Sequence, residues 1–268
     1  MSDTVTYLLA GPPGPRRSAV AEQLASRVDG RCIVLETGAP PSRLGDIRTA
    51  ISARPCHVVV LPAAGYDDGG PRVGIWLDMD GAGPEAVVDE ILARTTSVRT
   101  ALVVSEYDPR WPARFEEIAG RVAPAVADLG AAVEHVGSTA VPGLAAKPIV
   151  DVDVVVGSTS DVSAAIERLC SLGYVYQGDK GIRGREAFLW PPGTEPHHLY
   201  VVVAGSAPHA DHLDFRDYLR RHPEVADEYA SLKHRLAARH AEDSLGYTEA
   251  KNDFVSGALR RARGSTAP

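Results

Sequence analysis

Two aspartates, Asp151 and Asp153, stand two residues apart in an otherwise apolar, β-branched segment that the sequence predicts to be a strand. Side chains alternate across a strand, so both carboxylates project from the same face, about 7 Å apart at their Cα atoms. Like charges held this close repel one another, and a divalent cation relieves the repulsion. Mg²⁺ suits a site of oxygen ligands that also takes substrate phosphates. The pair therefore predicts a metal site with Asp151 and Asp153 as ligands.

Gly137 and Ser138 follow a second expected strand and precede the aspartates in the chain. Backbone N–H groups in such a turn, together with the serine hydroxyl, can hold a terminal phosphate. An ordered Gly-Ser and Asp-x-Asp pair resembles the arrangement that nucleotidyltransferase folds use. In that chemistry metal ions activate the acceptor oxygen, orient the triphosphate and neutralise the leaving pyrophosphate. Two alternatives stay open: metal-free ligand binding, and a structural pairing of the aspartates with Lys147 or Arg185.

Basic side chains near these motifs are candidates for phosphate contacts. The chain has four lysines, Lys147, Lys180, Lys233 and Lys251. Arginine supplies nearly all other basic charge, so each lysine in a motif is informative. Lys147 precedes the aspartate strand and either contacts a phosphate or neutralises Asp151, and Arg185 presents the same choice. His135 precedes the Gly-Ser turn and is either a buried, hydrogen-bonded residue or a catalytic one.

The segment 134–151 reads Glu-His-Val-Gly-Ser-Thr-Ala-Val-Pro-Gly-Leu-Ala-Ala-Lys-Pro-Ile-Val-Asp and resembles the signature of the GrpB family. The resemblance runs from Tyr107 to Val255. Its other motifs are Tyr107-Asp108-Pro109-Arg110-Trp111, Gly184-Arg185, His197-His198-Leu199, the segment 215–223, Tyr229-x-x-Leu232-Lys233 and Tyr247-x-x-Ala250-Lys251. It implies membership of the nucleotidyltransferase superfamily, to which that family is assigned.

The same resemblance implies roles for residues that composition alone does not single out. Arg216, Lys233 and Lys251 would face the nucleotide from the helical tail, although charge on such helices is usually a solvated surface. His198 would be a metal ligand or a base. Family members often carry His-x-His where this chain has Tyr200 in the second position. The third carboxylate that nucleotidyltransferases usually take from a later strand is also missing.

A weaker motif lies near the N-terminus. Gly11, Arg16, Arg17 and Ser18 follow an expected strand and open an expected helix, which is the context of a phosphate-binding P-loop. Arginine replaces both the second glycine and the lysine of that motif, and the later strand 57–61 ends in proline instead of an acidic residue. We therefore expect residues 1–104 to form a degenerate P-loop kinase-like domain. The alternative is a small-molecule kinase acting through Arg17 and Ser18. GrpB-like domains follow a P-loop kinase domain in some dephospho-CoA kinases, an order that this chain resembles.

The elements that must position these residues alternate along the chain. In 1–104 the patterns predict strands at 4–10, 32–35, 57–61 and 73–77 and helices at 18–28, 44–51 and 83–94, hence a parallel sheet with helices on both sides. In 105–268 they predict helices at 112–129, 161–172 and 209–261 and strands at 132–136, 148–156, 185–190 and 198–203. The fold class is α/β: a P-loop-like domain, then a nucleotidyltransferase-like domain with C-terminal helices.

Composition limits the partners. A net charge of −7 argues against a sequence-independent nucleic-acid binder. The sequence shows no signal peptide, no apolar run of about 18 residues and no paired cysteines, so we expect a cytoplasmic protein without a membrane span. The predicted function is Mg²⁺-dependent transfer of a nucleotidyl group from an NTP to a small-molecule acceptor. The alternative is a non-catalytic nucleotide-binding or assembly protein. The acceptor, the base and any homo-oligomer stay open.

Overall fold

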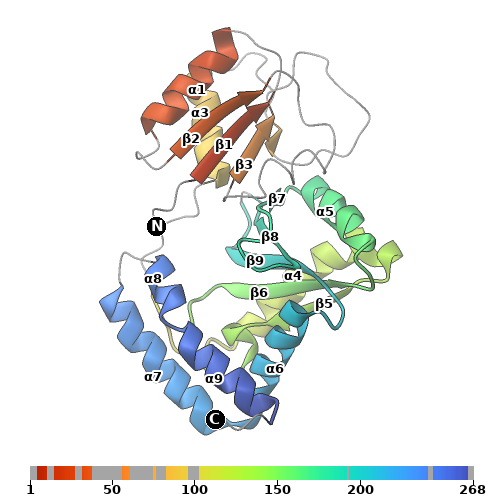
Figure 1. Cartoon of the computed structure of the whole chain (residues 1–268), viewed down its shortest axis with the longest axis vertical. Helices are drawn as coiled ribbons and strands as arrows, with labels where there is room; N and C mark the ends of the chain where they lie inside the picture. Colours follow the sequence, from red (N-terminus) through yellow and green to blue (C-terminus); the bar gives the residue numbers. More distant parts are fainter. Residues whose placement is uncertain are drawn as a thin grey trace. The chain divides into compact units, whose positions relative to one another are not determined.

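The structure is a computed structural model that describes residues 5–10, 15–27, 32–37, 56–60, 75–76, 83–95, 103–191, 193–240 and 244–264. Two sheets form within these residues, one of four strands and one of five (Figure 1). The chain divides into two compact units, residues 1–97 with 159–195 and residues 98–158 with 196–268. No helix in the described part is long and apolar enough to cross a membrane.

The N-terminal sheet is parallel, as its alternating pattern predicts. Its order is β2-β1-β3-β4, formed by β1 (Val5–Ala10), β2 (Cys32–Thr37), β3 (Cys56–Val60) and β4 (Ile75–Trp76). The helices α1 (Pro15–Arg27) and α3 (Pro84–Thr95) pack against each other and bury apolar residues such as Leu24 and Ile91. Gly11 and the expected helix 44–51 lie outside the described residues, so the P-loop stays a prediction.

The five-stranded sheet is mixed and has the order β5-β6-β9-β8-β7. Its strands are β5 (Ala132–Val136), β6 (Val150–Val156), β7 (Val175–Tyr176), β8 (Arg185–Leu189) and β9 (His197–Val203). β6 pairs antiparallel with β5 and parallel with β9. This register sets Asp151 opposite Val136 and His198, and Asp153 opposite Glu134 and Tyr200. One face of β6 therefore carries the acidic residues.

Helices cover both faces of β6. α4 (Trp111–Val126), extended by a short 3₁₀ turn at Ala127–Leu129, packs on β5 and β6 with Trp111 fully buried. Phe115 of α4 stacks on His135, which pairs with Val152, so α4 lies on the apolar face. α6 (Ala207–Arg221) contacts β5 and β9 and places His212 against Asp153, so it covers the acidic face.

The helical tail continues through α7 (Pro223–Arg239), α8 (Ser244–Glu249) and α9 (Asn252–Ala262) (Figure 1). It shares a hydrophobic core with the turn after β5, where Val141 and Leu144 meet Leu219, Tyr229 and other buried residues. This core fixes α7 beside the Gly-Ser turn. The remaining helix, α5 (Asp161–Ser171), follows β6 and buries its apolar residues, including Ile166 and Leu169.

Candidate functional site

Asp151 lies at the start of β6 and pairs with a histidine of the neighbouring strand. Its Oδ1 is 2.8 Å from Nδ1 of His198 on β9. Burial alone would raise the pKa of Asp151, but the hydrogen bond and charge of His198 outweigh it and hold that pKa below its usual range. An ionised carboxylate only accepts hydrogen bonds, so Nδ1 of His198 donates to Asp151. When the ring carries this proton alone, its Nε2 is an acceptor.

Asp153 makes a second carboxylate–imidazole pair, with a residue that sequence reasoning missed. Its side chain is fully buried, and Oδ2 lies 2.8 Å from Nδ1 of His212 on α6. Burial raises the pKa of Asp153, and the His212 hydrogen bond only partly offsets that effect. The ring of His212 also lies 5.8 Å from that of Tyr200. Where Tyr200 replaces the expected second histidine of β9, α6 therefore supplies an imidazole on the same face of the sheet.

A third acidic residue extends this row. Glu134 of β5 lies opposite Asp153, and its Oε2 is 3.4 Å from Nε2 of His209 on α6. The backbone N–H of Gly205 donates to Nδ1 of His209, so Nε2 carries the proton of the neutral ring and faces the carboxylate. Each acidic residue on this face is thus matched with one imidazole.

Gly137 has a backbone conformation, φ 70° and ψ −168°, that is essentially reserved for glycine. A Cβ atom at this position would overlap the Asp151 carboxylate. The Gly-Ser turn and the first aspartate are therefore in van der Waals contact. This close approach gives a structural reason for the Gly137–Asp151 combination that the sequence motif contains.

A cavity of about 210 Å³ opens beside this contact. Asp151 and His198 line it together with the Gly-Ser turn, the 146–149 segment, Tyr200 and the helical tail. Its lining residues are Ser138, Thr139, Ala146, Lys147, Ile149, Asp151, His198, Tyr200, Lys233, Tyr247, Thr248 and Lys251. Three of the chain's four lysines are in this list, and all of the lining belongs to the second unit. The structure therefore brings together six of the predicted site residues.

The three lysines are held in place by aromatic and polar contacts. Nζ of Lys233 donates to Ser138 Oγ at 3.2 Å and to the carbonyl of Ala145, and lies 4.4 Å from the centre of the Tyr229 ring. Nζ of Lys147 and Nζ of Lys251 lie 4.7 Å and 4.2 Å from the centre of the Tyr247 ring. Cation–π contacts of this kind orient an ammonium group without neutralising it.

Burial makes the charge of these lysines costly. Burial, followed by the charge of Lys251, lowers the pKa of Lys233 to about 7. Burial and the charge of Lys147 lower the pKa of Lys251 to about 8. Burial also lowers the pKa of Lys147. Asp151 opposes all three shifts, but a single carboxylate does not balance three ammonium groups.

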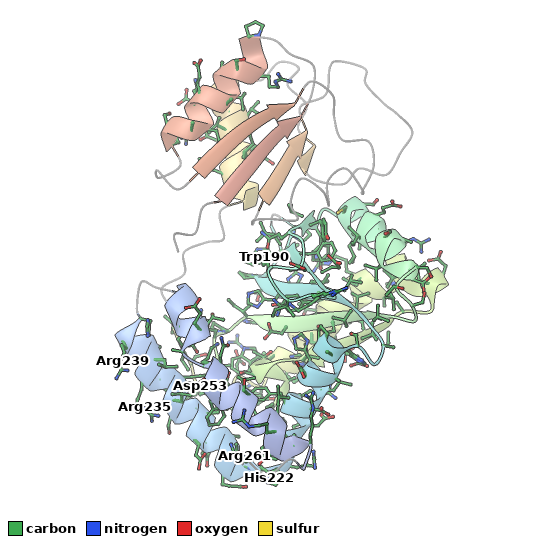
Figure 2. The ribbon with its side chains drawn as sticks, in the orientation of Figure 1. Trp190, His222, Arg235, Arg239, Asp253 and Arg261 are labelled. Atoms are coloured by element: carbon green, nitrogen blue, oxygen red, sulfur yellow. The ribbon has the colours of Figure 1, made fainter. Side chains whose placement is uncertain are left out.

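Arginines on the same helices lie elsewhere. Arg235 and Arg239 are exposed on the outer side of α7, whereas Lys233 of that helix is 2% exposed (Figure 2). Arg216 does not line the cavity; it donates to the carbonyl of His135 and to the carboxylate of Asp217. Arg185, on β8, is also absent from the lining. Phosphate contacts by Arg216 and Arg185 stay predictions.

His135 is packed and hydrogen-bonded, which is the first of the two roles that its position in the sequence allows. It stacks on Phe115 with ring centres 4.8 Å apart, and its Nε2 lies 3.0 Å from Thr139 Oγ1. Burial lowers the pKa of His135 to about 4, so the ring is neutral at physiological pH. Its carbonyl and that of Ala140 accept hydrogen bonds from Arg216 and Arg220 of α6, respectively. These contacts fix the turn that carries Ser138.

The donor set for a magnesium ion is incomplete. No group of three or more His, Cys, Asp or Glu side chains among the described residues could hold a metal ion. Asp151 and Asp153 each pair with a histidine, although Oδ1 of Asp153 is buried and makes no hydrogen bond there. Mg²⁺ prefers octahedral oxygen coordination, of which these two carboxylates supply only a part. Magnesium binding by Asp151 and Asp153 stays a prediction.

Comparison with known proteins decides the family. The family model described as "GrpB protein" matches residues 101–261, more than half of the chain. The chain belongs to the GrpB family. The resemblance that the 134–151 signature indicates is thereby confirmed.

Relatives in the GrpB family cover part of the chain. The UPF0157 protein YqkA of Bacillus subtilis is 36% identical over 157 residues, which is 59% of this chain and 46% of that protein. The crystal structure of GrpB from Enterococcus faecalis matches with a TM-score of 0.54 and 34% identity, over 60% of this chain and 96% of that one. A dephospho-CoA kinase of Mycolicibacterium paratuberculosis is 26% identical over 180 residues, 58% of this chain and 44% of that protein. The chain thus spans less than half the length of YqkA and of this kinase.

Proposed function

We propose that the cavity binds the phosphates of a nucleoside triphosphate and that the chain transfers the nucleotidyl group to a small-molecule acceptor. The observation that carries this proposal is the gathering of Lys147, Lys233 and Lys251, three of the chain's four lysines, around one cavity. Ser138 adds a hydroxyl to the same wall. Membership of the GrpB family fits this function without deciding it.

The lysines account for binding and for stabilisation of the leaving group. In nucleotidyl transfer the acceptor oxygen attacks the α-phosphorus, the bond to the bridging oxygen breaks, and negative charge grows on the departing pyrophosphate. Ammonium groups that are already in position stabilise that charge without reorganisation. Lys233 and Ser138, 3.2 Å apart, would contact one phosphate together.

Asp151 and His198 account for the proton of the acceptor. Asp151 orients the imidazole through Nδ1, which leaves Nε2 as the acceptor atom. His198 lines the cavity and its side chain is 44% exposed, so an acceptor hydroxyl or amine can reach it. The proton released when the acceptor attacks would move to Nε2 of His198, a general-base step. None of these steps depends on a metal ion.

One observation favours a second candidate function, binding without transfer. A cavity of about 210 Å³ is smaller than the roughly 300–1,000 Å³ of sites that enclose whole ligands. It suits a phosphate group with its neighbours more than a complete nucleotide. In that case the chain would hold a phosphorylated molecule and the Asp151–His198 pair would serve only to shape the pocket.

Pyrophosphate release separates the two functions. The full chain is incubated with each of the four NTPs and a protein-free bacterial metabolite extract, with and without Mg²⁺, and products are identified by mass spectrometry. Transfer predicts pyrophosphate and a nucleotidylated product, both strongly reduced in Asp151→Asn and His198→Gln and unchanged in Asp253→Asn, an exposed residue of α9. ATP binding without pyrophosphate would contradict transfer and support the binding function.

A further inference from the structure

The charge balance of the cavity is unusual for a site that takes phosphates through a metal ion. A bound metal needs anionic ligands, yet the lining contains three lysines and one carboxylate, Asp151. The buried Asp153 carboxylate is not part of the lining and pairs with His212. The positive charge that a metal would bring is already provided by side chains of the protein.

Lys233 is the most deeply buried of these cations. Its contacts are the Ser138 hydroxyl, the Ala145 carbonyl and the Tyr229 ring, and none of them is an anion. The charged groups that act on it are Lys251, at the start of α9, and Asp151 of β6. Lys251 in turn is acted on by Lys147 and Asp151. An anion that entered the cavity would therefore supply a counter-charge to Lys233 and Lys251.

We propose that Lys147, Lys233 and Lys251 bind the polyphosphate end of the ligand directly, without an intervening divalent cation, and that the site takes up a proton when it does so. This inference rests on the proposed function, because it concerns the same cavity. It narrows the substrate class to ligands with at least two adjacent phosphate charges, since a single carboxylate would leave most of the lysine charge unbalanced.

Proton uptake follows from linkage. Before an anion binds, Lys233 has a pKa of about 7 and Lys251 a pKa of about 8, so both are partly neutral near pH 8. A nearby anion favours the charged form and raises both pKa values. Binding must then draw protons from solution, and affinity must fall as the pH rises and the empty site loses its protons.

Isothermal titration calorimetry with ATP and EDTA at pH 8 tests the proposal. At that pH the phosphates of ATP are ionised, so net proton uptake comes from the protein. Titrations in buffers of different ionisation enthalpy should give an uptake of about one to one and a half protons per ATP bound. From pH 7.5 to 9 the affinity of the wild-type chain should fall about tenfold or more. This second measurement requires no substitution.

Two variants make the comparison specific. Lys233→Met should remove most of the proton uptake and weaken ATP binding, whereas Lys180→Met, the matched lysine outside the cavity, should leave both unchanged. ATP binding that requires Mg²⁺, or that shows no uptake in any buffer, would overturn the proposal. Metal-free binding with uptake but no pyrophosphate release would leave it standing while contradicting nucleotidyl transfer. Pyrophosphate release with strictly Mg²⁺-dependent binding would support nucleotidyl transfer and overturn the direct, metal-free binding by the lysines.

Discussion

At the scale of single residues, the position of the Asp151 carboxylate depends on the absence of a side chain at Gly137. The glycine has a positive φ, and a Cβ atom there would overlap the carboxylate. Gly143, six residues later, also has a positive φ, of 80°, but a Cβ atom there would meet nothing within 4 Å. The two positions therefore share a backbone conformation that would strain any other residue, and they differ in the contact with Asp151.

Two single substitutions, one at each glycine, separate the effect of backbone conformation from that of the contact with Asp151. Gly143→Ala should cost roughly 1–3 kcal/mol of unfolding free energy through backbone strain alone. Gly137→Ala should cost more, and it should also weaken ATP binding because Asp151 and His198 must move. Urea unfolding and ATP titration of both variants measure the two effects. Equal unfolding losses and equal ATP affinities would mean that the contact between Gly137 and Asp151 has no consequence.

The two histidine pairs should also differ. Asp153 is fully buried and its contact with His212 is the hydrogen bond that the structure gives its carboxylate, whereas Asp151 is partly exposed beside the cavity. His212→Ala should therefore lower the unfolding free energy by about 1–3 kcal/mol, because a buried acceptor loses its partner. His198→Ala should cost less, since water can replace the imidazole. Urea unfolding at pH 7 checks this order, and the reverse order would contradict the burial of Asp153.

At the scale of elements, α6 holds the Gly-Ser turn and the end of β5 through their backbone carbonyls. Nε and Nη2 of Arg220 donate to the carbonyl of Ala140 at 3.0 Å and 2.7 Å, and Arg216 donates to the carbonyl of His135. The neighbouring Arg221 is exposed and donates to Asp217 of its own helix. Two neighbouring arginines of this helix therefore differ: Arg220 reaches the turn and Arg221 does not.

Lysine at these two positions keeps the charge and removes the planar donor pair. Arg220→Lys should lower the unfolding free energy by about 1–2 kcal/mol and weaken ATP binding, because the Ala140 carbonyl loses the two hydrogen bonds that it accepts from one guanidinium group. Arg221→Lys should change neither quantity. Thermal or urea unfolding together with ATP titration checks both. An Arg220→Lys chain that behaves like Arg221→Lys would show that α6 does not support the turn.

The longer elements could be predicted from the sequence because their periodicity reports their burial. The strands 132–136 and 150–156 and the helix 161–171 lie within two residues of their expected bounds. The two-residue strand Val175–Tyr176 is too short to show any period, and it was missed. His212 was missed for a different reason. It lies in a charged helix far along the chain from Asp153, and only the packing of α6 on the sheet brings the two together.

At the scale of the whole molecule, lysine and arginine are used in different places. Lysine is rare in the sequence, and the motif context of Lys147, Lys233 and Lys251 was the signal available before the structure. The family resemblance implies that Lys233 and Lys251 face the nucleotide. Spacing along the chain does not by itself bring them to Lys147, because the three residues come from α7, the N-cap of α9 and the segment before β6. Arg185 and Arg216 are not among the residues that line this cavity, and their predicted phosphate contacts stay predictions.

The buried lysine also predicts how stability depends on pH. Lys233 has a pKa of about 7 in the folded chain and close to 10.5 in the unfolded one. Between these values the unfolded chain binds more protons, so this lysine makes the unfolding free energy rise as pH increases from 7 to 9. Urea unfolding should show a smaller rise in Lys233→Met than in wild type or in Arg235→Met, an exposed position on the same helix. Equal pH dependence in all three would contradict a buried, titrating Lys233.

The central claim is that the three-lysine cavity is the phosphate site, and equilibrium binding of ATP tests it most directly. The measurement compares wild type with Lys147→Met, Lys233→Met, Lys251→Met and Lys180→Met. Loss of one charge-assisted contact of about 1.5–3 kcal/mol corresponds to roughly a tenfold or greater loss of affinity. The account predicts such a loss for the three cavity variants and wild-type affinity for Lys180→Met. Unchanged affinity in all four lysine variants would contradict it. A loss of affinity that appears only in a further variant, Arg17→Ala, would contradict it as well.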